Sequence, residues 1–168
     1  MTQVQIGIFS GLNRVTLEHL ARTTVAATIS LYLANLFKLP NAYWAAITTL
    51  IVMQSTLGET LTISGQRFVG TALGAAAGAL LAARFDPSVI VFGSGVFLIG
   101  VICAVLHLGR AASALAGVTL ALVVLVERTE PPWELAAHRF LEVSLGIVVG
   151  LILTVLWPER SAHTATSW

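Results

Sequence analysis

The sequence predicts an all-α membrane protein with six transmembrane helices, arranged as two inverted three-helix repeats. Composition is the first observation behind this prediction: 57% of the 168 residues are hydrophobic, only 10% are charged, and the mean hydropathy is +0.89. A soluble domain needs roughly 25% charged residues to cover its surface. The other two observations are six apolar segments separated by turn residues, and a correspondence between the two halves of the chain.

The first predicted repeat, about 15–84, contains three spans. A helix needs about 20 apolar residues to cross the hydrocarbon core of a bilayer. The first long apolar run, about 19–37, meets this requirement and is followed by Pro40. The second span, about 42–56, ends before Gly58, and the third, about 66–84, lies inside a longer helix that begins near Gly58.

The second predicted repeat, about 87–157, contains the other three spans. The fourth span, about 88–108, follows Pro87, and the fifth, about 111–126, follows Gly109. The sixth, about 135–157, follows two prolines, which favour a helix start because no N–H bond is lost there. These spans leave no segment for a soluble domain, so we expect residues 1–168 to form a single integral membrane domain.

The two halves match at a constant offset of 72 positions, which relates QRFVGTALGAAAGALL to HRFLEVSLGIVVGLIL. The identical pairs are Arg67 and Arg139, Phe68 and Phe140, Leu73 and Leu145, Gly74 and Gly146, and Gly78 and Gly150. Because each half holds three spans, an odd number, the second half enters the membrane from the opposite side. Many transporters use such inverted repeats, with short segments in corresponding places at the binding site. The second and fifth spans are short, although both could simply extend into less apolar flanks.

The spacing of the glycines indicates which way the arginines face. At 100° per residue, Gly70, Gly74 and Gly78 lie on the same side of the third span as Arg67. This G-x-x-x-G pattern lets membrane helices pack closely. Gly146 and Gly150 repeat the pattern beside Arg139, with Glu142 in place of the first glycine. We therefore expect both arginines to face the bundle interior and the glycines to hold the two long helices close together.

Arg67 and Arg139 are the main candidates for a functional role. Each lies near the start of its predicted span, where an arginine and a helix N-terminus together favour an anion. In an inverted repeat the two would form basic mouths on opposite sides of the membrane. In the structural alternative, Arg139 pairs with Glu142, and Arg67 pairs with Glu59 or reaches the lipid headgroups.

Three other residues are weaker candidates for the site. Tyr43 and Trp44 open the second span, as interfacial aromatic residues do, but they could also stack on an aromatic substrate. His107 could relay protons, or it could simply be solvated at a span end.

Other classes of function have little support in the sequence. We find no catalytic set, no metal-ligand spacing and no cofactor motif, so we expect a protein that is not an enzyme. The net charge of +1 makes nucleic acid an unfavourable partner.

The distribution of basic residues weakly favours cytoplasmic N- and C-termini. In that orientation five of the nine basic residues fall inside, namely Arg14, Arg22, Arg67, Arg110 and Arg160. The four outside are Lys38, Arg84, Arg128 and Arg139.

Residues 43–81, from YWAAITTLIVMQ to the spaced glycines, resemble the signature of the fusaric acid resistance (FUSC) and aromatic acid exporter family. The ending HRFLEVSLGIVVGLILTVLWPER resembles the last span of that family. The resemblance implies a six-span module of the bacterial inner membrane that exports aromatic or other organic carboxylates. It also implies kinship with the plant aluminium-activated malate channels, whose anion path is basic.

The resemblance also implies roles for individual residues. Arg67 and Arg139 would belong to the anion path, Tyr43 and Trp44 would shape it, and the glycines would pack the helices. The larger exporters carry two membrane modules and a soluble region, so one module implies a homodimer in the lipid bilayer. The competing hypothesis is a membrane scaffold or accessory subunit that does not transport.

Overall fold

The computed structural model describes residues 14–53, 56–125 and 130–157, and every regular element in these ranges is an α-helix. The helices are α2 (Arg14–Leu36), α3 (Tyr43–Val52), α4 (Leu57–Arg84), α5 (Val89–Val105), α6 (Gly109–Leu125) and α7 (Pro132–Leu156). The all-α class and the six helices are therefore confirmed.

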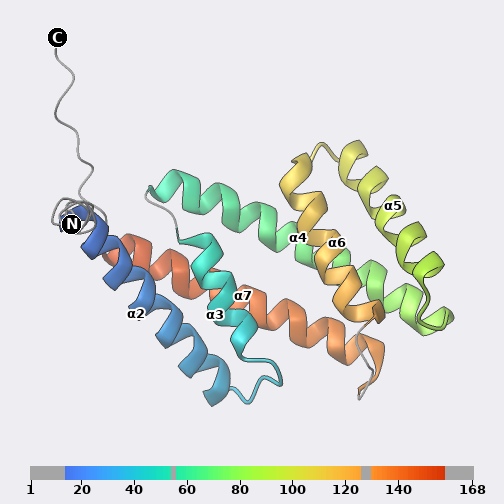
Figure 1. Ribbon diagram of the computed structural model, residues 1–168, viewed down its shortest axis with the longest axis horizontal. Helices are drawn as coiled ribbons and strands as arrows, with labels where there is room; N and C mark the ends of the chain where they lie inside the picture. The colour runs from blue at the N-terminus through green and yellow to red at the C-terminus, as the bar shows by residue number, and fades with distance from the viewer. Residues whose placement is uncertain (1–13, 54–55, 126–129, 158–168) are drawn as a thin grey trace, which may run out of the picture.

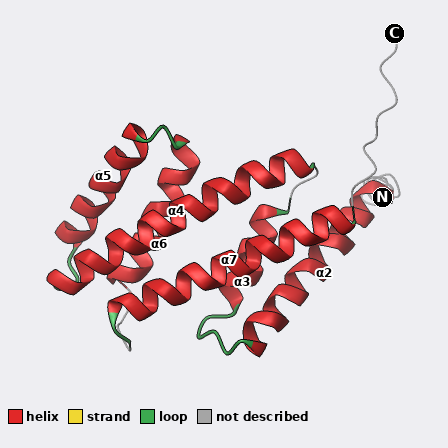
Figure 2. Cartoon of the chain, turned by 180° about the vertical axis from the view of Figure 1, so that it is seen from behind, coloured by secondary structure: helices red, strands yellow, loops and turns green. Residues whose placement is uncertain are grey.

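The two longest helices, α4 and α7, run antiparallel through the middle of the molecule (Figure 1). Helices α2 and α3 lie on one side of this central pair, and α5 and α6 lie on the other, as the view from behind also shows (Figure 2). Helix α6 packs on α4, and α3 packs on α7. The contacts among the described helices are symmetric between the two halves. When α2 is exchanged with α5, α3 with α6, and α4 with α7, every pair of helices in contact becomes a pair that is also in contact.

Local signals explain where the long helices begin. The Thr56 side chain accepts a hydrogen bond from the Glu59 backbone N–H at 3.3 Å, which caps α4 at its N-terminus. Helix α4 therefore starts at Leu57, nine residues before the predicted span. Ser88 caps α5 in the same way, by accepting a hydrogen bond from the Val91 N–H, and Pro132 is the first residue of α7.

The lengths of the other helices differ from the predicted spans. Helix α3 has only 10 residues, which reach about 15 Å, because the chain turns to an extended conformation at Met53. Helices α5 and α6 have 17 residues each. Within the described ranges, α7 is the one helix both long and apolar enough to cross a bilayer by itself. That all six helices cross a membrane stays a prediction.

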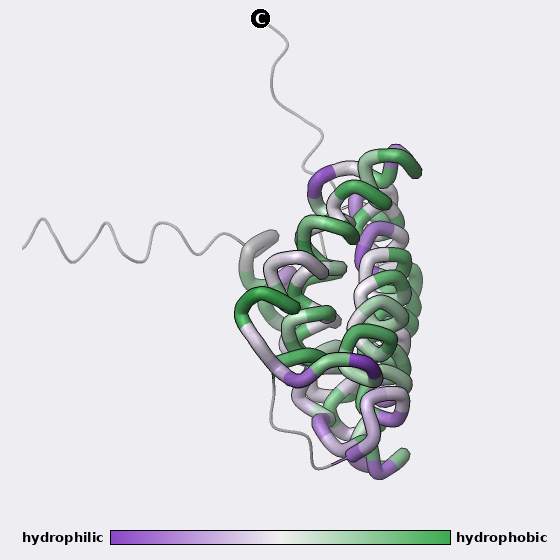
Figure 3. The backbone as a smooth tube through the Cα atoms, turned by 90° about the vertical axis from the view of Figure 1, so that its right-hand side faces the viewer, coloured by the Kyte–Doolittle hydropathy of each residue, from purple (hydrophilic) through white to green (hydrophobic). Residues whose placement is uncertain are grey.

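The outer surface of the bundle is strongly apolar. Val89 and Ile90 are each 83% exposed, and Phe97 is 74% exposed. Figure 3 shows that most of the chain is apolar and that strongly hydrophilic residues are few. Soluble monomers rarely expose contiguous apolar patches of this kind, so a lipid-facing surface explains the composition.

The sequence led us to expect that the glycine stripes of α4 and α7 face each other, but they do not. Gly74 lies against the Ala116 carbonyl of α6, and Gly146 lies against the Ala45 carbonyl of α3. Each long helix thus packs its stripe on the short helix of the other half. The other glycines of the two stripes have the same partners: Gly70 and Gly78 lie against α6, and Gly150 lies against α3. The helical wheel gives the side on which a stripe lies, but it does not identify the helix that covers it.

Substitution of Gly74 tests this packing. A Cβ atom at Gly74 would overlap the Ala116 backbone, so Gly74→Ala should destabilise the fold by about 1–3 kcal/mol. The matched control is Gly65→Ala on the same helix, where nothing lies within 4 Å of the added atom. Alanine favours a helix by about 0.5–1 kcal/mol over glycine, so the control should be neutral or stabilising. The apparent Tm in detergent distinguishes the two variants, and equal values would contradict the close contact.

Candidate functional site

Three of the buried charged side chains lie together where α3, α4 and α7 meet. Among the described residues, the charged side chains with at most 5% exposure are Arg22, Arg67, Arg139 and Glu142. Arg22 lies elsewhere, since its Nη1 donates to the Trp157 carbonyl at 3.1 Å, at the end of α7. Trp157 is 18 residues beyond Arg139, or roughly 27 Å along a helix, so the other three form a separate charged centre.

Arg67 points into the bundle and is held by a hydroxyl group. Its Nε and Nη2 donate to Thr48 Oγ1 at 3.1 and 3.0 Å, and Thr48 is fully buried. Arg67 therefore neither pairs with Glu59 nor reaches the lipid headgroups, the two contacts considered in the structural alternative. Arg67 is only 5% exposed, and Glu59 lies in the exposed first turn of α4. A neutral partner leaves the positive charge of Arg67 without a counterion at this contact.

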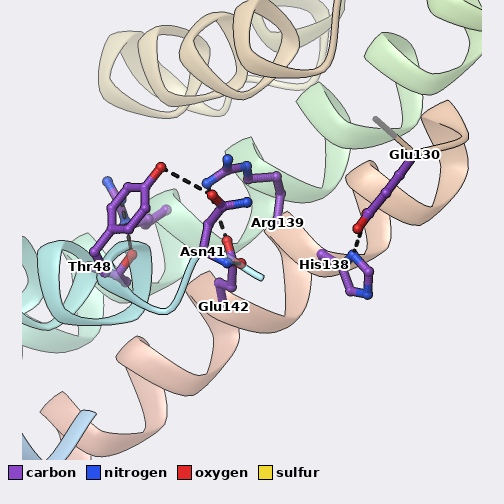
Figure 4. Close-up of polar contacts among 8 residues, drawn as sticks. Asn41, Thr48, Glu130, His138, Arg139 and Glu142 are labelled. Atoms are coloured by element: carbon purple, nitrogen blue, oxygen red, sulfur yellow. Dashed lines mark hydrogen bonds and ion pairs between the residues drawn. The ribbon is translucent and has the colours of Figure 1, made fainter. Parts of the chain in front are cut away.

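Arg139 has a carboxylate partner and an aromatic one. Its Nη1 donates to Glu142 Oε2 at 3.2 Å, and its Cζ atom lies 5.0 Å from the centre of the Trp44 ring. The other oxygen of Glu142, Oε1, accepts from the Asn41 backbone N–H at 2.9 Å, just before the start of α3 (Figure 4). The carboxylate therefore links α7 to the N-terminal end of α3, where the helix dipole favours a negative charge. His138 points away from this group and pairs with Glu130 at 3.1 Å.

Both arginines line one small cavity. The cavity measures about 20 Å³, and its lining residues are Trp44, Arg67, Thr71, Leu115, Val118, Thr119, Leu122, Arg139 and Val143. A space of this size holds about one water molecule. In this conformation the centre is therefore closed to an organic molecule.

Two donors in the lining have no hydrogen-bond partner. Arg139 Nε and Trp44 Nε1 are both buried and unpaired. Leaving such a buried donor unsatisfied costs about 1–3 kcal/mol, and more when the group is charged. A hydrogen-bond acceptor placed beside these two donors would remove this cost.

The position of the arginines differs from the two separate mouths that we expected. Arg67 lies ten residues after Leu57, or about 15 Å along α4, and Arg139 lies seven residues after Pro132 in α7. Both are beyond the first turn, where the helix dipole acts, so the helix N-termini do not contribute to binding there. The depth of each arginine follows from the helix start upstream of it, which is set by the Thr56 cap in α4 and by Pro132 at the first position of α7.

The neighbouring aromatic residues divide into inner and outer ones. Trp44 lies under Arg139, whereas Tyr43 is 52% exposed and its hydroxyl is 3.2 Å from Asn41 Oδ1. Phe68 and Phe140, which follow the two arginines, contact each other with ring centres 5.0 Å apart. Residues that correspond in the two halves therefore meet where α4 and α7 pack.

His107 lies away from the arginines. It lines an open cleft of about 580 Å³ between α5 and α6, together with Cys103, Arg110 and Ser113, and this cleft shares no lining residue with the central cavity. His107 itself is exposed in the turn after α5.

Two groups of the charged centre were not predicted: Thr48, which is the partner of Arg67, and the Asn41 backbone N–H, which is a partner of Glu142. Thr48 lies one helical turn after Trp44, so its position on α3 was a usable signal. The Asn41 N–H carries no signal in the sequence. Within the described ranges, no group of three or more His, Cys, Asp or Glu side chains is placed to hold a metal ion.

The apolar helical bundle with cationic side chains at its centre is typical of helical membrane proteins that have a buried polar site. The comparison with known families specifies it further. The model of the fusaric acid resistance protein-like family matches residues 26–153, and the chain belongs to that family.

Curated relatives cover most of this chain. It is 31% identical over 153 residues to the uncharacterized transporter YdhK of Escherichia coli K12 and 29% identical over 154 residues to the YdhK of Salmonella typhimurium. It is 29% identical over 153 residues to the inner membrane protein YeeA of Escherichia coli K12. These alignments cover 85–86% of the chain but only 22–23% of YdhK and 41% of YeeA, so the chain spans well under half the length of each. No solved structure matches it.

Removal of the Thr48 hydroxyl tests the arrangement around Arg67. Thr48→Val keeps the shape but leaves two buried guanidinium donors without an acceptor, so we expect a loss of about 1.5–3 kcal/mol of stability. Thr48→Ser keeps the hydroxyl and should retain most of that stability. The apparent Tm of the two proteins in detergent provides the comparison, and a Thr48→Val protein as stable as Thr48→Ser would rule out the contact.

Proposed function

We propose that this chain is a module of a bacterial inner-membrane transporter that exports organic carboxylates, aromatic ones among them. The observation that carries the proposal is the central cavity, where Arg67 and Arg139 from corresponding positions of the two halves lie beside two unpaired donors. The printed names of the relatives, a transporter and an inner membrane protein, support the same class and location.

The charge of the centre favours an anion. Two guanidinium groups and one carboxylate are buried there, so one positive charge has no partner among the three. A buried charge is costly unless it is paired and hydrogen-bonded. A carboxylate that entered the cavity would supply both a negative charge and acceptors for Arg139 Nε and Trp44 Nε1.

The arrangement of the helices suggests how the site opens. Two observations support an inverted repeat: the helix contacts are symmetric between the two halves, and the sequences of the halves match at an offset of 72 positions. In such proteins the halves rock about a central site and open it to one side at a time. A cavity with room for one water corresponds to the closed state of such a cycle, and entry of a substrate requires α3 or α6 to move away.

The indole of Trp44 provides an aromatic surface beside the cationic group. In this state its ring lies against Arg139, and an aromatic acid could place its ring there and its carboxylate at the arginines. Tyr43, being half exposed, would act at the entrance.

Three finer expectations stay predictions. Cytoplasmic termini rest in part on Arg128 and Arg160, which lie outside the described residues. The spans predicted at 42–56 and 111–126 also include residues outside that part of the chain. The homodimer is tested by cross-linking in native membranes.

Flux through proteoliposomes tests the proposal. We expect uptake of labelled benzoate by the wild-type protein and a fall of about tenfold or more in Arg67→Gln and in Arg139→Gln, because each loses a charge-assisted contact of about 1.5–3 kcal/mol. Arg84→Gln is the matched control, since Arg84 is exposed at the end of α4. Dependence of the flux on an imposed pH gradient separates a proton-coupled carrier from a channel.

The competing hypothesis is a scaffold or accessory subunit, in which the arginines serve packing alone. Under that hypothesis the wild-type protein carries no anion, and the two variants differ from it only in stability. Equal reconstitution of all proteins, measured by quantitative immunoblotting, is required before fluxes are compared.

A further inference from the structure

Glu142 breaks the correspondence between the two halves at the centre. The position 72 residues earlier is Gly70, which lies against the backbone of Ala112, with the carbonyl oxygen 2.5 Å from the place a Cβ atom would take. In the second half a fully buried carboxylate takes the place of this glycine and reaches the backbone N–H of Asn41. One half therefore carries an arginine alone, and the other carries an arginine with a carboxylate.

We propose that Glu142 determines the charge of the anion that the central site accepts: with Glu142 the site takes a monoanion, and without it the site takes a dianion. This inference rests on the proposed anion-binding function of the centre. It assigns to Glu142 a role in substrate specificity that the function itself does not require.

The balance of buried charges carries the argument. Arg67 and Arg139 contribute two positive charges at the cavity, and Glu142 neutralises one of them through its contact with Arg139. The other buried charged residue of the described ranges, Arg22, is at the far end of α7. With a bound monoanion the net charge of the centre is zero, and with a bound dianion it is −1. Because apolar surroundings penalise an unbalanced charge, the centre with Glu142 favours the monoanion.

The hydrogen bonds also favour an anion with a single carboxylate group. Glu142 occupies only Nη1 of Arg139, and the Nε of that guanidinium is left buried and unpaired beside the unpaired Trp44 Nε1. The open donors can serve one carboxylate group. The place that a second carboxylate would need on Arg139 is already held by Glu142.

A structural role alone is the competing explanation, since Glu142 also links α7 to α3 through Asn41. Glu142→Gln separates the two roles, because its amide oxygen can still accept from the Asn41 N–H, while the negative charge and the acceptor for Arg139 Nη1 are both lost. Glu142→Gly, which copies the first half, is a second variant. Glu59→Gln is the matched control, as Glu59 is an exposed carboxylate on α4.

Binding of benzoate and terephthalate provides the test, since these aromatic probes differ by one carboxylate. Affinities of the purified full chain are measured by titration calorimetry at neutral pH. We expect the wild-type protein and Glu59→Gln to prefer benzoate, and Glu142→Gln to shift the ratio of the two affinities toward terephthalate by about tenfold or more. Glu142→Gly should shift it in the same direction.

The outcomes distinguish failure of this inference from failure of the proposed function. Benzoate binding that requires Arg139, with the same ratio of affinities in Glu142→Gln as in the wild type, would overturn the role of Glu142 alone. Absence of binding of either probe to the folded wild-type and Glu142→Gln proteins would overturn both.

Discussion

Two buried guanidinium groups constrain the rest of this structure. Arg67 and Arg139 are each 5% exposed within a bundle whose outside is apolar. Their charges are accommodated by a hydroxyl, a carboxylate and an indole ring, and two of these three groups come from the short helix α3. The position of α3 is therefore as important to the centre as the arginines themselves.

The glycine stripes allow the short helices to approach the long ones. Gly146 brings the backbone of α7 against α3, and this close approach brings Thr48 and Trp44 to the level of the arginines. Gly74 does the same for α6, which contributes Thr119 to the cavity. The same small residues thus serve both packing and the assembly of the site.

Much of the fold, and part of the centre, could be predicted from the sequence. Composition and turn residues give six helices, and the 100° period places both arginines toward the interior. The Arg139–Glu142 pair follows from an i, i+3 spacing. The depth of Arg67 could have been found from Thr56 and Glu59, whose spacing is typical of a helix start. The partner of each glycine stripe and the common cavity could not, because they depend on which helices meet in space and no local pattern encodes that choice.

The exchange of packing partners between the halves has a consequence for biosynthesis. Helix α3 has 10 residues, too few to cross a bilayer unaided, and its main neighbour α7 is the last described helix in the chain. During translation α3 therefore lacks its main neighbour until about 100 further residues, up to the end of α7, have been added to the chain. Docking of α7 on α3 completes the contacts around Arg67 and Arg139, so until α7 has been made the buried charge of Arg67 lacks the neighbours that enclose it.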